Sequence, residues 1–293
     1  GLMLLGSSAD LVTIYLSLEL ASLPVIALIA FKKTNIQYLE AALKFLILSA
    51  ISSAVLVYGF ALLYGLTGTL QLISTNEPTI ADVITSFASL QSNIGLAAAL
   101  VLITAGFGFK LSIVPFHMWT PDVFEGAPIP VGAFLSIASK AAAFAVILRV
   151  FYMAFGDVNF DWATMFAALS AVTMTVGNLI AIQQTSIKRL LGYSTIAHAG
   201  YMLAALTAVG AWKWGHIDAP ADFATVIIGA VIFHLAVLVV FKLGAFLVLG
   251  MLEMEGGASR LSALSGLARR DPLIATSMFI FMLSLAGVPP LAG

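Results

Sequence analysis

Cysteine is absent from this sequence and charged residues are scarce. Without cysteine, the chain can form no disulfide, no thiolate metal site and no cysteine-ligated iron–sulfur cluster. Only 9% of its 293 residues are charged, whereas an ordinary soluble domain has about 25%. This composition argues against a water-soluble fold, and any electron transfer must take place in another chain.

Long apolar runs separated by short polar breaks make up most of the sequence, and 61% of the residues are hydrophobic. A helix of about 20 residues crosses the roughly 30 Å of hydrocarbon in a bilayer. The runs therefore predict an all-α, polytopic transmembrane bundle with a helix end at 1–8 and eight spans. The expected spans are 10–31, 38–65, 93–112, 128–152, 162–183, 190–210, 222–251 and 272–293. A membrane β-barrel would instead show short segments of alternating polarity.

The two ends of the sequence predict that it is truncated on both sides. Its first residue is glycine rather than methionine, and residues 287–293 lie inside an apolar segment. A longer parent chain is therefore expected.

Cationic residues outside the spans divide unevenly between the two sides of the membrane. One side receives seven of them: Lys32, Lys33, Lys188, Arg189, Arg260, Arg269 and Arg270. The other side receives Arg149 and Lys213. Because cytoplasmic loops carry the excess of positive charge, the Lys32/Lys33 and Lys188/Arg189 loops are predicted to be cytoplasmic. A bacterial inner membrane is the expected location.

Four lysines and one glutamate remain inside the predicted spans. They are Lys44, Lys110, Lys140, Lys242 and Glu19. A lysine at a helix centre costs about 2.5–3.5 kcal/mol on the insertion scale, so each needs a compensating contact. Lys44 and Lys242 fall near predicted helix ends and could snorkel to the interface, whereas Lys140 lies well inside its span.

A lysine beside a carboxylate offers a way to load and release a proton. Desolvation favours the neutral amine, and a nearby carboxylate favours the ammonium. At about 4 Å and an effective dielectric of about 20, such a pair is worth roughly 4 kcal/mol. Moving one charge across 100 mV takes about 2.3 kcal/mol. Making and breaking a Glu–Lys pair therefore has the magnitude that a proton pump requires.

Residues 106–121 predict a broken helix at membrane depth. Pro115 cannot donate the helical hydrogen bond to residue 111, and Gly106 and Gly108 loosen the preceding turns. The helix is expected to break just after Lys110. Broken helices recur at transporter ion sites, where the freed backbone faces protein or a water-filled cavity. The alternative is that this break is a kink used only for packing. The GVPP sequence at 287–290 predicts a second break.

The stretch GFGFKLSIVPFHMWTPDVFEGAPIPVGAFLSIASKAAAF (106–144) resembles the central signature of the antiporter-like membrane subunits of complex I, the NADH:quinone oxidoreductase. Its form is most similar to the subunit N branch, equivalent to mitochondrial subunit 2. Further similar stretches are 16–24, 40–68, 187–203 and 283–293. The resemblance implies two inverted repeats of five helices, each with a discontinuous helix. Residues 1–152 would be the first repeat, lacking its start, and 162–293 the second, lacking its end.

The resemblance also implies roles for individual residues. The proton path would run through Glu19, Lys44, Lys110 and Lys140, with His117, His234 and Lys242 as further candidates. Lys242 stands where an uncharged polar residue is expected in this branch. The charged residue expected after the second break lies beyond residue 293.

Other polar and small residues allow a plainer interpretation. His117 could equally satisfy carbonyls freed at the break, and His198 and Tyr201 are interpreted as packed polar groups. The small residues at 49–54 and 141–145 are typical of close helix packing.

A member of this family would translocate protons while partner subunits reduce quinone. No cofactor or metal is expected in this chain, since it has neither a nucleotide-binding glycine loop nor a histidine cluster with ligand spacing. FMN, iron–sulfur clusters and quinone are expected in the partners. Those partners are the other membrane-arm subunits, with the lipid bilayer around them; neither nucleic acid nor direct NADH binding is expected. The alternatives are a subunit of a multisubunit Na⁺/H⁺ antiporter and a structural linker with inert charges.

Overall fold

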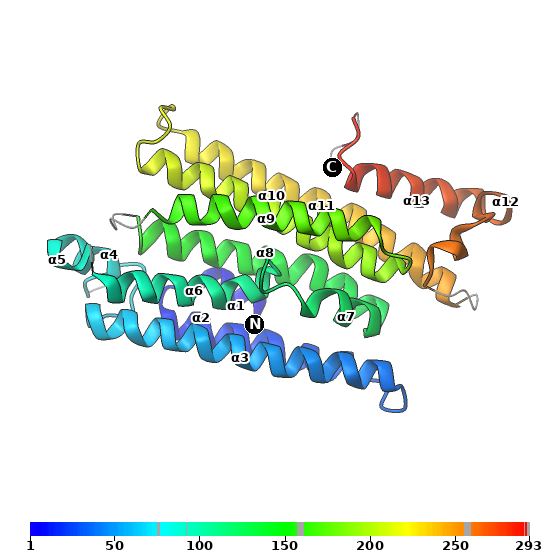
Figure 1. The fold of residues 1–293 in the computed structure, drawn as a ribbon, viewed down its shortest axis with the longest axis horizontal. Coiled ribbons are helices and arrows are strands. Elements are labelled where there is room, and N and C mark those ends of the chain that lie inside the picture. Colours follow the sequence, from blue (N-terminus) through cyan, green and yellow to red (C-terminus); the bar gives the residue numbers. More distant parts are fainter. Residues whose placement is uncertain (75–76, 92, 157–160, 255–258, 290, 292–293) are drawn as a thin grey trace.

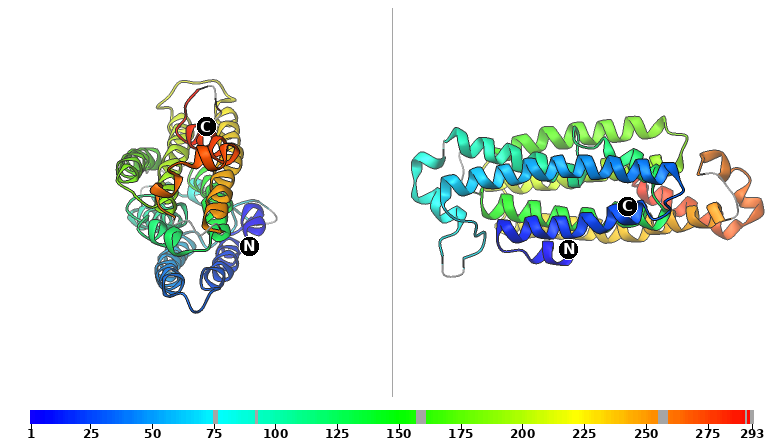
Figure 2. Two further views of the ribbon diagram at one scale, coloured as in Figure 1. Left: turned by 90° about the vertical axis from the view of Figure 1, so that its right-hand side faces the viewer. Right: turned by 90° about the horizontal axis from the view of Figure 1, so that it is seen from below.

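The computed structural model describes residues 1–74, 77–91, 93–156, 161–254, 259–289 and 291. These residues form a bundle whose long helices run along one common axis (Figures 1 and 2). Within these ranges there is no β-strand, only isolated bridges between Asp10 and Gln71 and between Ser186 and Arg260. The prediction of an all-α transmembrane bundle is confirmed.

Within the described ranges, six helices are long and apolar enough to cross a membrane. They are α2 (Leu11–Ile29), α3 (Ile36–Thr67), α6 (Ile94–Leu111), α8 (Ile129–Met153), α9 (Trp162–Ile182) and α11 (Phe223–Met254). The two other expected spans, 190–210 and 272–293, each contain a helix, and the second is helical only as far as Leu285. Of these, α10 (Ile187–Lys213) is less apolar and is enclosed by its neighbours, and α13 (Pro272–Leu285) has only 14 residues. The chain is an integral, multi-pass membrane protein.

Local sequence signals explain where the long helices begin. A side-chain oxygen before each of five of them accepts a hydrogen bond from the first turn, which satisfies a backbone N–H that has no helical partner. These capping residues are Asp10, Asn35, Asn93, Asp161 and Ser186.

Short helices precede α2 and fill the connections between the long helices. They are α1 (Leu2–Ser7), α4 (Ile80–Ser86), α5 (Ala88–Gln91), α7 (Trp119–Gly126), the 3₁₀ helix η1 (Leu261–Leu264) and α12 (Leu267–Arg270). Hydrogen bonds between Thr79 and Asp82 cap α4, and they lower the pKa of the Asp82 carboxyl.

The connections gather at two ends of the bundle. Those between α2 and α3, between α9 and α10, and between α11 and α13 lie at one end, whereas α4, α5 and the α10–α11 connection lie at the other (Figures 1 and 2). The first end carries the seven cationic residues that the sequence assigns to one side, and it is called the cationic end below.

Close packing of α6 on α3 positions the broken helix. At Gly106 an added Cβ would lie 2.6 Å from Cβ of Leu56, so only glycine allows this approach. The close contact brings Lys110, one turn further along α6, onto the face of α3 that carries Ser49.

The polypeptide leaves helical geometry at Leu111, where α6 ends, and resumes it at Trp119, where α7 begins. Ser112 follows α6 in the left-handed region with φ 62°. Near the second predicted break, α13 ends at Leu285; Pro290 lies outside the described residues.

Candidate functional site

A band of polar side chains crosses the middle of the bundle between two apolar clusters. In α8, Lys140 lies between Leu135 of one cluster and Ala143 of the other. The band contains three lysines whose exposed fractions are 7% for Lys110, 2% for Lys140 and 0% for Lys242. Because apolar residues cover both sides of the band, these ammonium groups contact protein oxygens and not bulk water.

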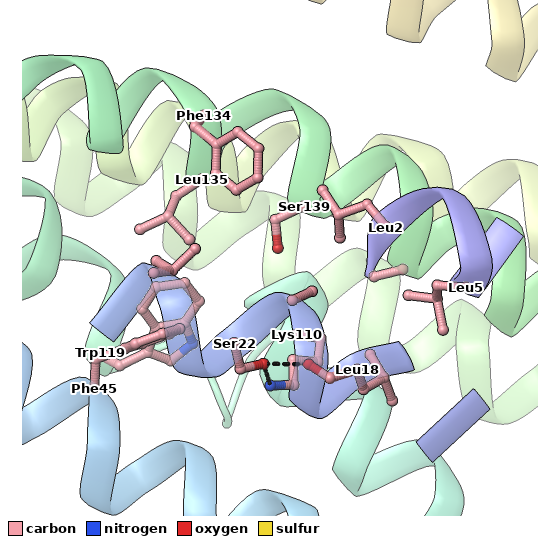
Figure 3. Close-up of a pocket in the computed structure, with 13 residues that line it drawn as sticks. Leu2, Leu5, Leu18, Ser22, Phe45, Lys110, Trp119, Phe134, Leu135 and Ser139 are labelled. Atoms are coloured by element: carbon pink, nitrogen blue, oxygen red, sulfur yellow. Dashed lines mark hydrogen bonds between the residues drawn. The ribbon is translucent and has the colours of Figure 1, made fainter. Parts of the chain in front are cut away.

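Two serines hold Lys110 in the last turn of α6. Its Nζ lies 2.6 Å from Oγ of Ser22 on α2 and 3.0 Å from Oγ of Ser49 on α3. Ser22 donates its own proton to the Leu18 carbonyl at 2.6 Å, so its lone pairs face the ammonium (Figure 3). A cavity of about 20 Å³ adjoins Lys110, enough for a single water molecule.

Glu19 lies half-buried on α2, one turn from Ser22, and accepts a hydrogen bond from Ser53 of α3. Among the described residues, no ion pair joins Glu19 to Lys110. The direct Glu–Lys pair that sequence reasoning invoked is therefore not formed in this conformation. Serine hydroxyls take the place of the ionic partner at both groups.

The break in the helix creates the site of Lys140. Its Nζ donates to the backbone carbonyl of Lys110 at 2.9 Å and to Oγ of Ser112, and Thr120 donates to the same oxygen at 2.6 Å. The Lys140 Nζ also lies 5.0 Å from the ring centroid of Trp119. Since a helix C-terminus carries partial negative charge, ending α6 at this depth stabilises two cations inside the bundle.

Lys242 extends the band into the second half of the chain. Its Nζ donates to Oγ1 of Thr195 on α10 at 2.7 Å, and Thr195 donates to the Leu191 carbonyl at 2.8 Å. Lys140 lies within electrostatic range of both Lys110 and Lys242. The interpretation that Lys242 snorkels to the interface is wrong: α11 continues to Met254, and the side chain is fully enclosed.

A histidine pair adjoins Lys242. His198 on α10 and His234 on α11 approach within 3.2 Å through Nδ1 and Nε2. The ring of Tyr201 stands edge-on to His198, and the Tyr201 hydroxyl accepts from Asn178 at 2.9 Å. Sequence reasoning named His234 but interpreted His198 as a packed polar group. The available signal was one histidine inside each of two consecutive spans.

Lys44 lies in different surroundings at the cationic end. Its side chain is 43% exposed, and its Nζ contacts Glu40 at 2.8 Å and Asp122 at 2.9 Å. Arg189 bridges Asp122 at 2.9 Å and Glu125 at 3.0 Å, which ties α7 to α3 and α10. The structure therefore does not bring Lys44 into the buried band, and its position matches the snorkelling interpretation.

His117 is half-buried in the segment between α6 and α7. Its Nδ1 makes no hydrogen bond within the described part of the chain. The structure does not join it to the lysine band.

Sequence reasoning missed the hydroxyl groups that hold the charges. Ser49 and Ser53 belong to the small-residue run interpreted as a packing surface, yet they contact Lys110 and Glu19. Their spacing of four residues places them on one helix face. Which helix that face meets depends on the fold, so the spacing alone could not assign the contacts.

Sequence comparison places these features among known membrane proteins. The chain matches the NADH:quinone oxidoreductase/Mrp antiporter transmembrane family over residues 8–293. Over its whole length it is 42% identical to NADH-quinone oxidoreductase subunit N of Desulforamulus reducens and 40% identical to NAD(P)H-quinone oxidoreductase subunit 2 of Synechocystis sp.. It spans 57% of the first relative and 53% of the second.

Solved structures similar to this chain include members of both classes of membrane complex that the family description names. A chain of respiratory complex I from Thermus thermophilus is 39% identical with a TM-score of 0.76, over 99% of this chain and 57% of that one. A chain of the Mrp complex from Dietzia sp. is 26% identical with a TM-score of 0.78, over 96% of this chain and 48% of that one. The band of buried lysines thus lies in a chain that belongs to the NADH:quinone oxidoreductase/Mrp antiporter transmembrane family.

Proposed function

We propose that this chain is the proton-conducting part of a membrane-arm subunit of an NADH:quinone oxidoreductase, the counterpart of subunit N. The observation that carries the proposal is the band of three enclosed lysines, Lys110, Lys140 and Lys242, each held by neutral oxygens. Glu19 lies at one end of this band and the His198–His234 pair at the other. The proton would move along this series.

Neutral oxygen ligands suit a group that changes its charge. A hydroxyl both accepts and donates hydrogen bonds, so it can accept from an ammonium and, after rotating, donate to a neutral amine. Lys140 lies between two other lysines, and a charge on one makes a charge on the next less favourable. A proton that arrives at one end therefore favours release of a proton further along.

Energy for this movement would come from partner subunits. The chain contains no cysteine to hold an iron–sulfur cluster. FMN, iron–sulfur clusters and quinone would bind in those partners, and quinone reduction there would change the Glu19–Lys110–Lys140 charge state.

The arrangement in the membrane follows from the charge distribution. The cationic end would face the bacterial cytoplasm, and half-exposed Lys44 would lie at the mouth of the path on that side. Residues 1–152 and 162–293 would form two inverted repeats, and the interruption after Leu111 would be the broken helix of the first. His117, within that interruption, remains a candidate for a supporting role.

Replacing Lys140 with methionine in the assembled complex tests the proposal. Methionine fills a similar volume and carries no proton, so proton pumping into membrane vesicles should fall while the complex still assembles. Lys32→Met, which changes an exposed loop lysine, is the matched control. Unchanged pumping by Lys140→Met alongside normal NADH oxidation would refute the function.

A second candidate is a subunit of a multisubunit Na⁺/H⁺ antiporter, which the 26% identical chain of the Mrp complex favours. The two candidates differ in their partners and in the driving reaction. Co-purification with flavin and iron–sulfur subunits supports the oxidoreductase. Vesicles that exchange Na⁺ for H⁺ without NADH support the antiporter.

A further inference from the structure

The residues that separate Glu19 from Lys110 form a regular arrangement on two antiparallel helices. On α2, Glu19 and Ser22 are three residues apart, and on α3, Ser49 and Ser53 are four apart, so each pair shares one helix face. Ser53 donates to Glu19, and Ser22 and Ser49 both accept from Lys110. The two helices thus offer two levels of polar contact, about one helical turn (~5.4 Å) apart.

Each charged group is satisfied at its own level without touching the other. At the first level the Glu19 carboxylate accepts a hydrogen bond from the Ser53 hydroxyl. At the second, Ser22 is turned by its bond to the Leu18 carbonyl so that its lone pairs meet the ammonium. Two hydrogen bonds from the ammonium have a free energy similar to that of a single Lys–Glu ion pair, so both arrangements are accessible.

A small cavity, enough for a single water molecule, lies beside this contact. The cavity of about 20 Å³ next to Lys110 is lined by Ser22 and Leu18 of α2 as well as by Lys110 itself (Figure 3). The lysine ammonium sits on a flexible four-carbon stem, and a shift of one helical turn along α2 would bring it to Glu19.

We propose that Ser22, Ser49 and Ser53 are positioning residues that hold Lys110 and Glu19 apart and thereby make their ion pair reversible. The inference rests on the proposed proton-conducting function and assigns a role to residues that resemble mere packing residues. With the hydroxyls gone, Lys110 would be left without partners in its present position and would pair permanently with Glu19. A permanent pair would trap the charge and slow every turnover.

The test compares serine variants in the intact complex. The double variant Ser22→Ala/Ser49→Ala should slow proton pumping about tenfold or more, since each of its two substitutions removes one hydrogen bond to the Lys110 ammonium. A cryo-EM map of this double variant should place the Lys110 Nζ within about 4 Å of a Glu19 oxygen, the usual ion-pair distance. Restoring the hydroxyls as Ser22→Thr with Ser49→Thr should restore most of the pumping rate.

Ser52→Ala is the matched control. Ser52 is also buried on α3, but it donates to the Gly106 carbonyl at 3.0 Å and to neither charged group. This variant should pump at more than half the original rate, and its Lys110 should stay at Ser22 and Ser49.

Two outcomes separate this inference from the function on which it rests. Normal pumping by the double alanine variant, together with loss of pumping in Lys110→Met, overturns the role of the serines and leaves the function standing. Normal pumping by both variants overturns the function as well. Should the double variant fail to assemble, Ser49→Ala alone is used. Lys110 then keeps its hydrogen bond to Ser22, and smaller changes are expected in the pumping rate and in the position of the Lys110 Nζ.

Discussion

Lys44 and Lys140 lie inside helices of the same bundle, yet their surroundings are opposite. Lys44 is half-exposed and contacts two carboxylates, those of Glu40 and Asp122. Lys140 is enclosed, and its hydrogen bonds go to a backbone carbonyl and a serine hydroxyl. Carboxylates strongly favour the ammonium form, whereas neutral oxygens favour it less and therefore allow the lysine to release its proton more easily.

The contrast shows that position in the bundle, not residue type, decides what a membrane lysine does. At the cationic end, water and carboxylates keep a lysine charged and useful for tethering α7. Between the two apolar clusters, a lysine has only the oxygens that neighbouring helices supply. Transport should therefore depend on the enclosed lysines far more than on Lys44.

Methionine substitutions at Lys242 and Lys44 test this contrast most strongly. Lys242→Met breaks the band between Lys140 and the histidine pair, so pumping should fall about tenfold or more, equal to at least about 1.4 kcal/mol on the barrier. Lys44→Met removes a partly exposed charge; of its two neighbours, Asp122 keeps Arg189 and Glu40 is exposed to solvent, so pumping should fall about twofold at most. NADH-driven acidification of vesicles measures both. Equal losses in the two variants would contradict the contrast.

Two substitutions of Ser112 separate an effect on proton pumping from an effect on stability. The expected changes are smaller than those at Lys242. Its φ of 62° suits glycine, whereas a residue with a Cβ pays about 1–2 kcal/mol there. Ser112→Gly and Ser112→Ala both remove the hydroxyl that joins Lys140 to Thr120. The glycine variant should be more stable to heat than the alanine variant, yet both should lose pumping to the same extent. If pumping instead follows thermal stability, the hydroxyl has no part in transport.

Helix positions could be predicted from the sequence because their signals are local. The expected span 162–183 is the helix Trp162–Ile182 in the structure, and Asp161 caps its first turn. The expected span 128–152 is the helix Ile129–Met153. The length of an apolar run and a capping residue suffice for such boundaries. The interruption after Leu111 follows from Pro115, which is equally local.

Contacts between helices could not be predicted in the same way. Lys110 and Ser49 are 61 residues apart and His198 and His234 are 36 apart, so each contact depends on how two helices are rotated against each other. Lys242 was placed near a helix end because the expected span stopped three residues before Met254. The sequence located the charges in the membrane, but the oxygens that hold them became visible only in three dimensions.

The smallest expected effect concerns the ion pairs at the cationic end. Asp122 contacts both Lys44 and Arg189, whereas the one ion pair of Glu125 within the described residues is with Arg189. Asp122→Asn should therefore destabilise the attachment of α7 more than Glu125→Gln does. Both losses should stay at or below about 1 kcal/mol, because exposed ion pairs are screened and each cation keeps another carboxylate. Thermal unfolding of the detergent-solubilised complex measures the order, and pumping should change little in either variant. A pumping loss in Asp122→Asn as large as that in Lys242→Met would mean that the ion pairs at the cationic end limit the rate of proton movement as strongly as the enclosed lysines do.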